Sequence, residues 1–340
     1  MKILYHIKYP QGMGADRFIY EGYKHAWEDN GHQFFTFSEG DVLAQKLEEL
    51  KPDLFFTSFD YLKIPNDINI IKRFRAEGVK MFVGVDTFFD KDLSRLAVLK
   101  DPDFADVYFT EKEPELMKRF EEKTGKKYNV MPHAADKLIH FPTEPVKKYQ
   151  YDVVYLGAKL PMKSRLFTDV LIPLTKNKKY RVGVFGPCWT IKDNTLRLLN
   201  NICRRIRFKK GADFFNKSRI VIPLNEENQL YSSAKICLNF HERKKDGATL
   251  NVVNQRTFKI PACGGFEICD YVPALRKYFN EDEVVIASLS PQDWFNKINY
   301  YLNHEKERKA IQEKGTTRAL ENHTYHNRIK QILELYNELL

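Results

Sequence analysis

Long apolar runs are missing from this sequence. No stretch of about 18 or more uncharged apolar residues occurs, which is the length that a membrane-spanning helix requires. The first residues, 1–7, are followed by Lys8 and Pro10 too soon to form the apolar core of a signal peptide. We therefore expect a cytoplasmic protein.

Cysteine is scarce and unpaired in the sequence. The chain has 5 cysteines, an odd number, and none forms a Cys-x-x-Cys pair. Most of them stand in apolar, strand-like contexts, where a free thiol behaves as a small buried hydrophobe. We predict reduced core cysteines, with no disulfide framework and no metal site.

Positive charge is in excess. Lys and Arg number 55 against 45 Asp and Glu, which gives a net charge of +10 and favours anionic partners. Basic residues cluster at 176–181, 204–210 and 243–245, and each cluster is also compatible with an ordinary solvated face. The cluster 204–210 has one interleaved aromatic and no accompanying nucleic-acid motif, so nucleic acid is disfavoured as a partner. A peripheral contact with an anionic membrane stays open.

Short β-branched or aromatic runs alternate with helical stretches from the first residues onward, which is a βαβ rhythm. We expect strands at 3–7, 33–37, 54–57, 80–85, 107–110 and 128–131, and then at 152–156, 180–185, 219–222, 236–240, 266–269 and 284–287. The segment 141–148, with two prolines and no periodicity, indicates a linker between the two series. The pattern predicts an α/β protein of two doubly wound, Rossmann-like domains.

The strongest chemical signal lies at 254–271. A helix there is expected to end at Gly264 and Gly265 and to lead into a buried strand that ends at Asp270. Glycines at such a junction permit positive φ and close approach to the backbone, although a glycine pair is also the usual end of a helix. Arg256, near the start of the helix, supplies a forked cation suited to a pyrophosphate.

This segment, Asn239, the run 300–308 and the terminal His-Thr-Tyr-x-x-Arg motif at 323–328 together resemble the CgeB (spore maturation) family. That family is similar to GT-B-fold glycosyltransferases with a group 1-type C-terminal domain. The resemblance covers about residues 150–330, and the N-terminal half matches only in its βαβ pattern.

The resemblance implies two Rossmann-like domains facing across a cleft. It implies an acceptor domain at 1–146, a donor domain at 147–324, and a helix at 325–340 that packs back on the N-terminal domain. The implied reaction moves a sugar from a UDP- or GDP-linked donor to an acceptor hydroxyl or amine, without a metal or another cofactor. The acceptor is a glycan, a protein or another molecule that the sequence does not name.

The donor site is implied by positions that match the family pattern. Without a metal, the diphosphate charge must be met by Lys and Arg side chains and by backbone N–H groups. The donor-binding residues expected are Gly157, Lys159, Lys163, Arg165, Phe185, Gly186, Asn239, Arg256, Lys259, Gly264, Gly265 and Asp270.

Lys259 departs from the family pattern, which has a Glu here to bind the donor ribose hydroxyls. A Lys donates hydrogen bonds but accepts none, so the ribose clamp is lost or rebuilt, with Glu267 or Asp270 as the alternative carboxylates. Two interpretations remain: an altered donor preference, or a non-catalytic nucleotide- or glycan-binding protein of GT-B fold.

The expected catalytic groups are Asp86, which follows a strand and suits a general base if the enzyme inverts, and His241 at the end of another strand. Gly12 and Gly14 form a Gly-x-Gly turn on the acceptor side, without the third Gly of a dinucleotide fingerprint, so NAD is disfavoured. His133 is expected to line the acceptor side of the cleft. The choice between retention and inversion stays open.

Overall fold

The computed structural model describes residues 1–8, 10, 15–85, 92–244 and 247–340. The chain divides into two compact units. Unit 1 contains the described residues of 1–10, 16–133 and 325–340, and unit 2 contains Ala15 and the described residues of 134–324. Within the described part of the chain, no helix combines the length and hydropathy needed to cross a bilayer.

Unit 1 is built on a six-stranded parallel sheet in the order β2-β1-β3-β4-β5-β6. The strands are β1 (Lys2–His6), β2 (Gln33–Phe37), β3 (Leu54–Ser58), β4 (Lys80–Gly84), β5 (Val107–Thr110) and β6 (Asn129–Val130). Its helices are α1 (Asp16–Asp29), α2 (Leu43–Leu50), α3 (Asn66–Ala76), α4 (Leu93–Lys100), α5 (Pro114–Thr124) and α15 (Tyr325–Asn337). Buried strand residues such as Leu4, Phe55 and Met81 form the core with apolar residues of these helices.

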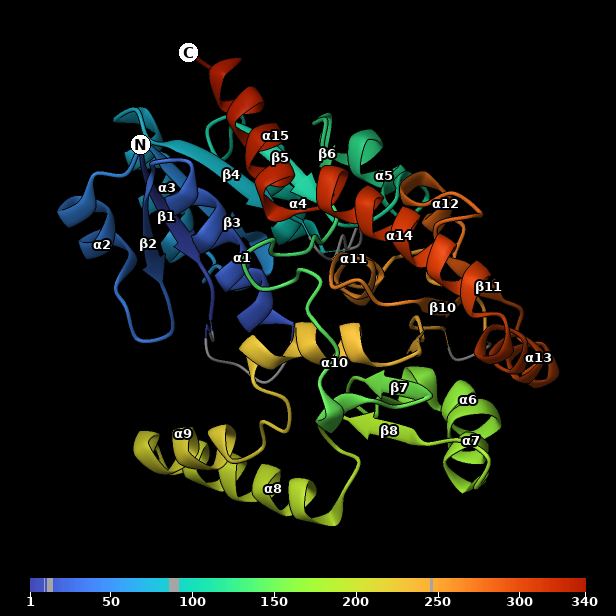
Figure 1. Ribbon diagram of the computed structural model, residues 1–340. Helices are drawn as coiled ribbons and strands as arrows, with labels where there is room; N and C mark the ends of the chain where they lie inside the picture. The colour runs from blue at the N-terminus through green and yellow to red at the C-terminus, as the bar shows by residue number, and fades with distance from the viewer. Residues whose placement is uncertain (9, 11–14, 86–91, 245–246) are drawn as a thin grey trace. The chain divides into compact units, whose positions relative to one another are not determined.

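The last helix, α15, packs on α1. Tyr325 lies against Gly22, where an added Cβ would stand only 2.1 Å from the tyrosine ring, and the rings of Tyr23 and Tyr325 are 4.9 Å apart. Arg328 donates from Nε to the carbonyl oxygen of Pro132 at 2.9 Å. The C-terminal helix is thus a part of unit 1 (Figure 1).

Unit 2 has a five-stranded parallel sheet in the order β11-β10-β9-β7-β8. The strands are β7 (Val153–Leu156), β8 (Val182–Phe185), β9 (Ile236–Asn239), β10 (Glu267–Asp270) and β11 (Val285–Ala287). The longer helices are α8 (Ile191–Arg205), α9 (Lys209–Lys217), α13 (Pro291–Asn303) and α14 (Glu305–Asn322). Shorter turns of helix complete the unit: α6 (Ser164–Leu166), α7 (Ile172–Lys176), α10 (Glu227–Ser233), α11 (Arg256–Ala262) and α12 (Leu275–Tyr278).

The prediction of two doubly wound α/β domains is confirmed, because both described sheets are wholly parallel with helices in the connections. The strand predicted at 219–222 is wrong. The side chain of Arg219 forms a buried ion pair with Asp193 at the start of α8, Nε to Oδ1 at 2.8 Å. That pair holds the segment against the helices, and β8 is left at the edge of the sheet.

The proline-containing segment 141–148 is a part of unit 2 and packs on its helix α10. The backbone N–H of Thr143 donates to Oγ of Ser232 at 3.0 Å, and that of Val146 donates to Oγ of Ser233 at 2.9 Å. Both serines belong to α10. The segment is therefore attached to this helix by side-chain acceptors.

A buried ion pair joins α10 to α11. The ammonium of Lys259 contacts Oε1 of Glu227, with side chains 5% and 2% exposed, and Nε2 of His140 lies 3.9 Å from Oε2. Burial opposes ionisation of Glu227, but the charge of Lys259 and the contact with His140 outweigh it and lower the pKa of Glu227 to about 2. The unusual Lys259 thus has a carboxylate partner inside unit 2.

Replacing Gly22 with Ala should destabilise unit 1 by about 1–3 kcal/mol, because the new methyl group displaces the ring of Tyr325. Thermal or urea unfolding measures the effect. The control is Glu21→Ala, one residue earlier in α1. Equal stability of the Gly22→Ala variant and the wild type would contradict the packing described.

Glu227→Gln should lower the free energy of unfolding by about 3–5 kcal/mol near neutral pH, because it removes the carboxylate that neutralises the buried charge of Lys259. The double variant Glu227→Gln/Lys259→Met should recover much of this loss, since neither charge remains. The folded-state pKa of Glu227 is lowered from 4.5 to about 2, so the pair's contribution is complete above about pH 4.5 and disappears as the pH falls through about 2. Urea unfolding between about pH 5 and pH 3 should therefore show a steeper loss for the wild type than for the double variant. A double variant no more stable than Glu227→Gln would contradict this.

Candidate functional site

Polar side chains meet at the carboxyl ends of β9 and β10 in unit 2. Asn239 ends β9 and Asp270 ends β10, and the two parallel strands are paired with Asn239 opposite Cys269. Because parallel strands end at the same edge of a sheet, residues that follow them lie close together. This edge carries the candidate site.

The imidazole of His241, just after β9, is held on both sides. Its Nδ1 lies 3.1 Å from Oδ1 of Asp270, and its Nε2 lies 3.0 Å from Oγ1 of Thr257. The arrangement fits a ring that donates from Nδ1 to the carboxylate and accepts the threonine hydroxyl at Nε2. His241 is 1% exposed, so its orientation is fixed and its use as a base requires the Thr257 bond to break.

Asp270 is the anion of this group. Burial opposes its ionisation, but the side-chain and backbone hydrogen bonds from His241 and the charge of Arg243 outweigh it and lower the pKa of Asp270. Nη2 of Arg243 donates to Oδ2 at 2.5 Å. Glu267, by contrast, is buried with one amide donor, Nδ2 of Asn239 at 2.8 Å, and burial raises its pKa to about 8. Neither carboxylate faces solvent as a ribose acceptor.

Arg256, at the start of α11, lies beside this network. Its Nε donates to Oδ1 of Asn239 at 3.0 Å, and its Nη2 donates to the carbonyl oxygen of Phe240 at 3.3 Å. Gly157 makes room for the guanidinium, since a Cβ there would lie 2.8 Å from Nη1. These acceptors are uncharged, and no carboxylate in the described part of the chain forms an ion pair with Arg256. Its positive charge is therefore available to an anion.

Lys163 is a second cation without a counter-ion. It lies in the short turn after Pro161, is buried, and forms no ion pair with any described residue. Burial and then the charge of Arg256 lower its pKa from 10.5 to about 7, although Glu242 and Asp270 oppose the shift. An arriving anion would restore the charged form.

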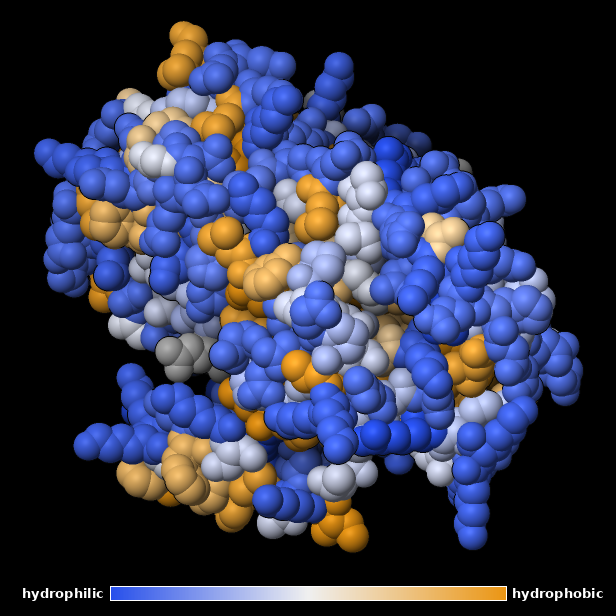
Figure 2. Space-filling model, in the orientation of Figure 1, coloured by the Kyte–Doolittle hydropathy of each residue, from blue (hydrophilic) through white to orange (hydrophobic). Residues whose placement is uncertain are grey.

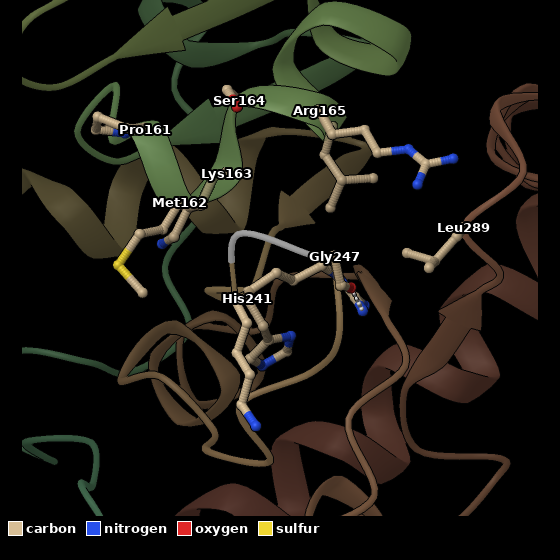
Figure 3. A pocket seen from close by; sticks show the side chains of 11 residues that line it. Pro161, Met162, Lys163, Ser164, Arg165, His241, Gly247 and Leu289 are labelled. Carbon is tan, nitrogen blue, oxygen red and sulfur yellow. Dashed lines mark hydrogen bonds between the residues drawn. The ribbon is translucent and has the colours of Figure 1, made fainter.

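A cavity of about 400 Å³ opens next to these groups, wholly within unit 2 (Figure 3). In Figure 3, Lys163 and Arg165 come from the same segment at one side of the cavity, with the Arg165 side chain extending sideways, and His241 lies on the opposite side. The described lining residues include four cations and no Asp or Glu: Pro161, Met162, Lys163, Ser164, Arg165, Leu166, His241, Arg243, Lys244, Gly247 and Leu289. Such a cavity suits a small, strongly anionic ligand.

Two predicted glycines, Gly157 and Gly186, allow the backbone to pass close to Arg256. Gly186 has φ +117°, and a Cβ there would lie 2.6 Å from the carbonyl oxygen of Gly157, so a side chain is excluded. Phe185 is half-buried and packs edge-on against Tyr151. Lys159 is exposed, with its Nζ 5.6 Å from the ring centre of Trp189. Neither Phe185 nor Lys159 lines the cavity.

Gly264 and Gly265 lie at the other end of β10. Gly264 has φ +68° just after α11, and its Cβ position faces Pro142. At Gly265 an added Cβ would lie 2.9 Å from the carbonyl oxygen of Ile260. They precede the strand that Asp270 ends, and neither lines the cavity, as is also true of the buried Lys259. Within the predicted segment 254–271, Lys259, Gly264 and Gly265 therefore have structural roles, whereas Arg256 and Asp270 belong to the site.

The acceptor-side predictions fall in different places. Gly12, Gly14 and Asp86 lie outside the described residues. His133 belongs to unit 1, where its Nε2 lies 2.5 Å from Oε2 of Glu111. Burial opposes ionisation of Glu111, but His133 and Lys112 lower its pKa.

Sequence reasoning missed Arg243, Lys244 and Thr257 as site residues. The basic run 243–245 directly after a predicted strand was the available signal for the first two. Nothing in the sequence marks Thr257. Within the described ranges, no group of three or more His, Cys, Asp or Glu side chains is placed to hold a metal ion.

Several solved structures have the same architecture as this chain over nearly its whole length. Sucrose-phosphate synthase from Thermosynechococcus elongatus superposes with a TM-score of 0.64 at 12% identity, covering 100% of this chain and 99% of that one. Anabaena HepE in complex with UDP-glucose gives 0.62 at 13% identity, with 98% and 99% covered. An alpha-glucosyltransferase (AGT) in complex with UDP gives 0.64 at 11% identity, with 99% and 100% covered. These likenesses show the GT-B fold.

Sequence comparison assigns the family. No curated protein sequence is significantly similar to the chain. The family model described as "Glycosyl transferase-like" matches residues 165–334, half of the chain, and this range includes most of the cavity lining. The chain belongs to the glycosyl transferase-like family and is a glycosyltransferase of GT-B fold.

Proposed function

We propose that this glycosyltransferase takes a nucleoside diphosphate sugar as its donor and binds the diphosphate, without a metal, in the cavity of unit 2. The observation that carries the proposal is the cavity's lining of Lys163, Arg165, Arg243 and Lys244 with no carboxylate among its described residues. Arg256, which has only uncharged acceptors, adds a fifth cation beside it. Fixed cations of this kind take the place of a divalent metal at a diphosphate.

The reaction breaks the bond between the anomeric carbon and the phosphate oxygen and forms a bond from that carbon to the acceptor atom. The acceptor hydroxyl or amine gives up its proton to a general base, for which Asp86 is the predicted group if the enzyme inverts. The departing nucleoside diphosphate takes the electron pair, and the cations around the cavity stabilise its growing negative charge. Asp270 contributes indirectly, because its carboxylate orients Arg243 and His241. Asp86 and His241 stay predictions as catalytic groups, and retention or inversion depends on them.

UDP is the nucleotide we propose first, ahead of GDP. Support comes from neighbours of the same fold, since HepE was solved with UDP-glucose and AGT with UDP. A related AGT complex contains DNA with a HMU base, whereas another neighbour is a sucrose-phosphate synthase. Because acceptors vary so widely within one fold, we propose only an acceptor hydroxyl or amine for this chain.

Within the family we propose a CgeB-like member, on the strength of the His-Thr-Tyr-x-x-Arg motif. Three residues of the motif, His323, Tyr325 and Arg328, make specific contacts in the structure. Nε2 of His323 lies 2.9 Å from the carbonyl oxygen of Tyr278, Tyr325 packs on Gly22, and Arg328 binds the backbone at Pro132. The motif would therefore mark the start of the helix that returns to unit 1.

A non-catalytic nucleotide-binding protein is the second candidate. It is favoured by Lys259, whose charge is neutralised by Glu227 in the interior, and by the burial of Glu267 and Asp270, the two carboxylates expected as alternatives for the donor ribose. Incubation with a panel of UDP- and GDP-sugars separates the two. Nucleotide binding without hydrolysis or transfer of any sugar would select the second candidate.

Arg256→Ala should raise the Kd for UDP by about 10- to 100-fold, because one charge-assisted contact to the diphosphate is lost. Isothermal titration in the presence of a chelator measures it. Arg276→Ala is the matched control, since Arg276 also donates to a backbone carbonyl of unit 2, that of Asn280 at 2.7 Å, whereas Arg256 is bonded to Asn239 and Phe240 beside the cavity. Equal UDP affinity of the two variants would place the nucleotide elsewhere.

Affinity for UDP-glucose should fall as the pH rises through about 7, where Lys163 loses its proton in the unliganded protein. The sign follows because the charged ammonium, present below that pH, attracts the diphosphate. UDP-glucose is the appropriate ligand since its diphosphate does not titrate in this range. Lys163→Arg should flatten the profile, because guanidinium stays charged. Parallel wild-type and Lys163→Arg profiles would exclude Lys163 as the titrating group.

A further inference from the structure

In the sequence, helices α8 and α9 follow β8 and precede β9, and the two helices lie side by side as a hairpin (Figure 1). Nδ2 of Asn200 donates to the carbonyl oxygen of Ala212 at 2.7 Å and ties one helix to the other. Gly211 of α9 allows the close approach, because a Cβ there would lie 2.9 Å from Sγ of Cys203 in α8. The hairpin is thus a preformed element.

Large apolar side chains of the hairpin are left uncovered. Ile191, Leu198 and Ile202 are 88%, 59% and 47% exposed, and their spacing of seven and four residues places them on one stripe of α8. Further exposed apolar residues follow at the turn and beyond: Ile206, Phe208, Phe214 and Val221. Figure 2 shows hydrophobic surface over α8 and α9 set among hydrophilic side chains.

Positive charge surrounds this apolar surface. The segment 191–221 contains nine Lys and Arg and two Asp, a net charge of +7 out of the chain's +10. One of the two acids, Asp193, is already neutralised by the buried Arg219. Arg205, Lys209 and Lys210 are exposed at the end of α8 and the start of α9. The hairpin therefore combines an apolar stripe with most of the protein's excess charge.

We propose that the α8–α9 hairpin is a docking surface for an anionic lipid bilayer. Apolar side chains enter the boundary between headgroups and acyl chains, while flanking Lys and Arg bind anionic headgroups. A second copy of the chain is a poor occupant, because it would bring +7 against +7. Nucleic acid would satisfy the cations but leave the stripe of Ile191, Leu198 and Ile202 in water. An anionic bilayer would cover the apolar stripe and would also neutralise the flanking cations.

The test is cosedimentation of the full chain with phosphatidylcholine vesicles, with and without about three parts in ten phosphatidylserine. The wild type should bind only the anionic vesicles. Ile191→Ser/Leu198→Ser/Ile202→Ser and Arg205→Glu/Lys210→Glu should each bind about tenfold or more weakly. These side chains are exposed, so both variants should keep the wild-type unfolding temperature and UDP affinity.

Two matched controls make the result specific. Lys176→Glu/Lys178→Glu makes the same change in net charge at exposed positions outside the hairpin, and Val42→Ser/Leu93→Ser removes exposed apolar side chains of unit 1. Both should keep vesicle binding. Equal losses in these controls, or no binding by the wild type, would overturn the proposal. Self-association through the hairpin without vesicle binding, seen by light scattering, would assign the surface to a second copy instead.

Discussion

The buried carboxylate of Asp270 is the group on which the candidate site depends. It is fully enclosed at the end of β10, and such a charge is tolerated only where donors surround it. The backbone and imidazole of His241 and the guanidinium of Arg243 supply them. One anion in the interior therefore fixes a histidine and an arginine at the wall of the cavity.

Two neighbouring cations, Arg256 and Lys163, have no carboxylate partner in the described part of the chain, and this imbalance gives the cavity its chemical character. Arg256 has amide and carbonyl acceptors only, and Lys163 is buried without an ion-pair partner in the described part of the chain. Elsewhere in unit 2 a buried cation does have its carboxylate, as Lys259 has Glu227. The contrast between this neutralised interior pair and the two cations without a described carboxylate partner, Lys163 and Arg256, is what an anion-binding site requires.

Periodic features of the sequence predicted the fold well, whereas the site depended on contacts that no periodicity reports. The doubly wound halves followed from alternating apolar runs, but the strand expected at 219–222 failed because Arg219 found a buried partner in Asp193. Asn239, Arg256 and Asp270 do converge, since each stands next to the carboxyl end of a parallel strand. Glu227 lies 32 residues before Lys259 and could not be identified as its partner from the sequence, because only the tertiary fold brings α10 onto α11.

The central claim is that the cavity of unit 2 binds the donor diphosphate through side-chain cations without a metal. A crystal structure of the protein with UDP, grown in the presence of a chelator, tests it most directly. We expect phosphate oxygens within hydrogen-bonding distance of Lys163 and Arg243, next to Arg256. A diphosphate bound away from these residues, or one that binds only when a divalent cation is supplied, would contradict it.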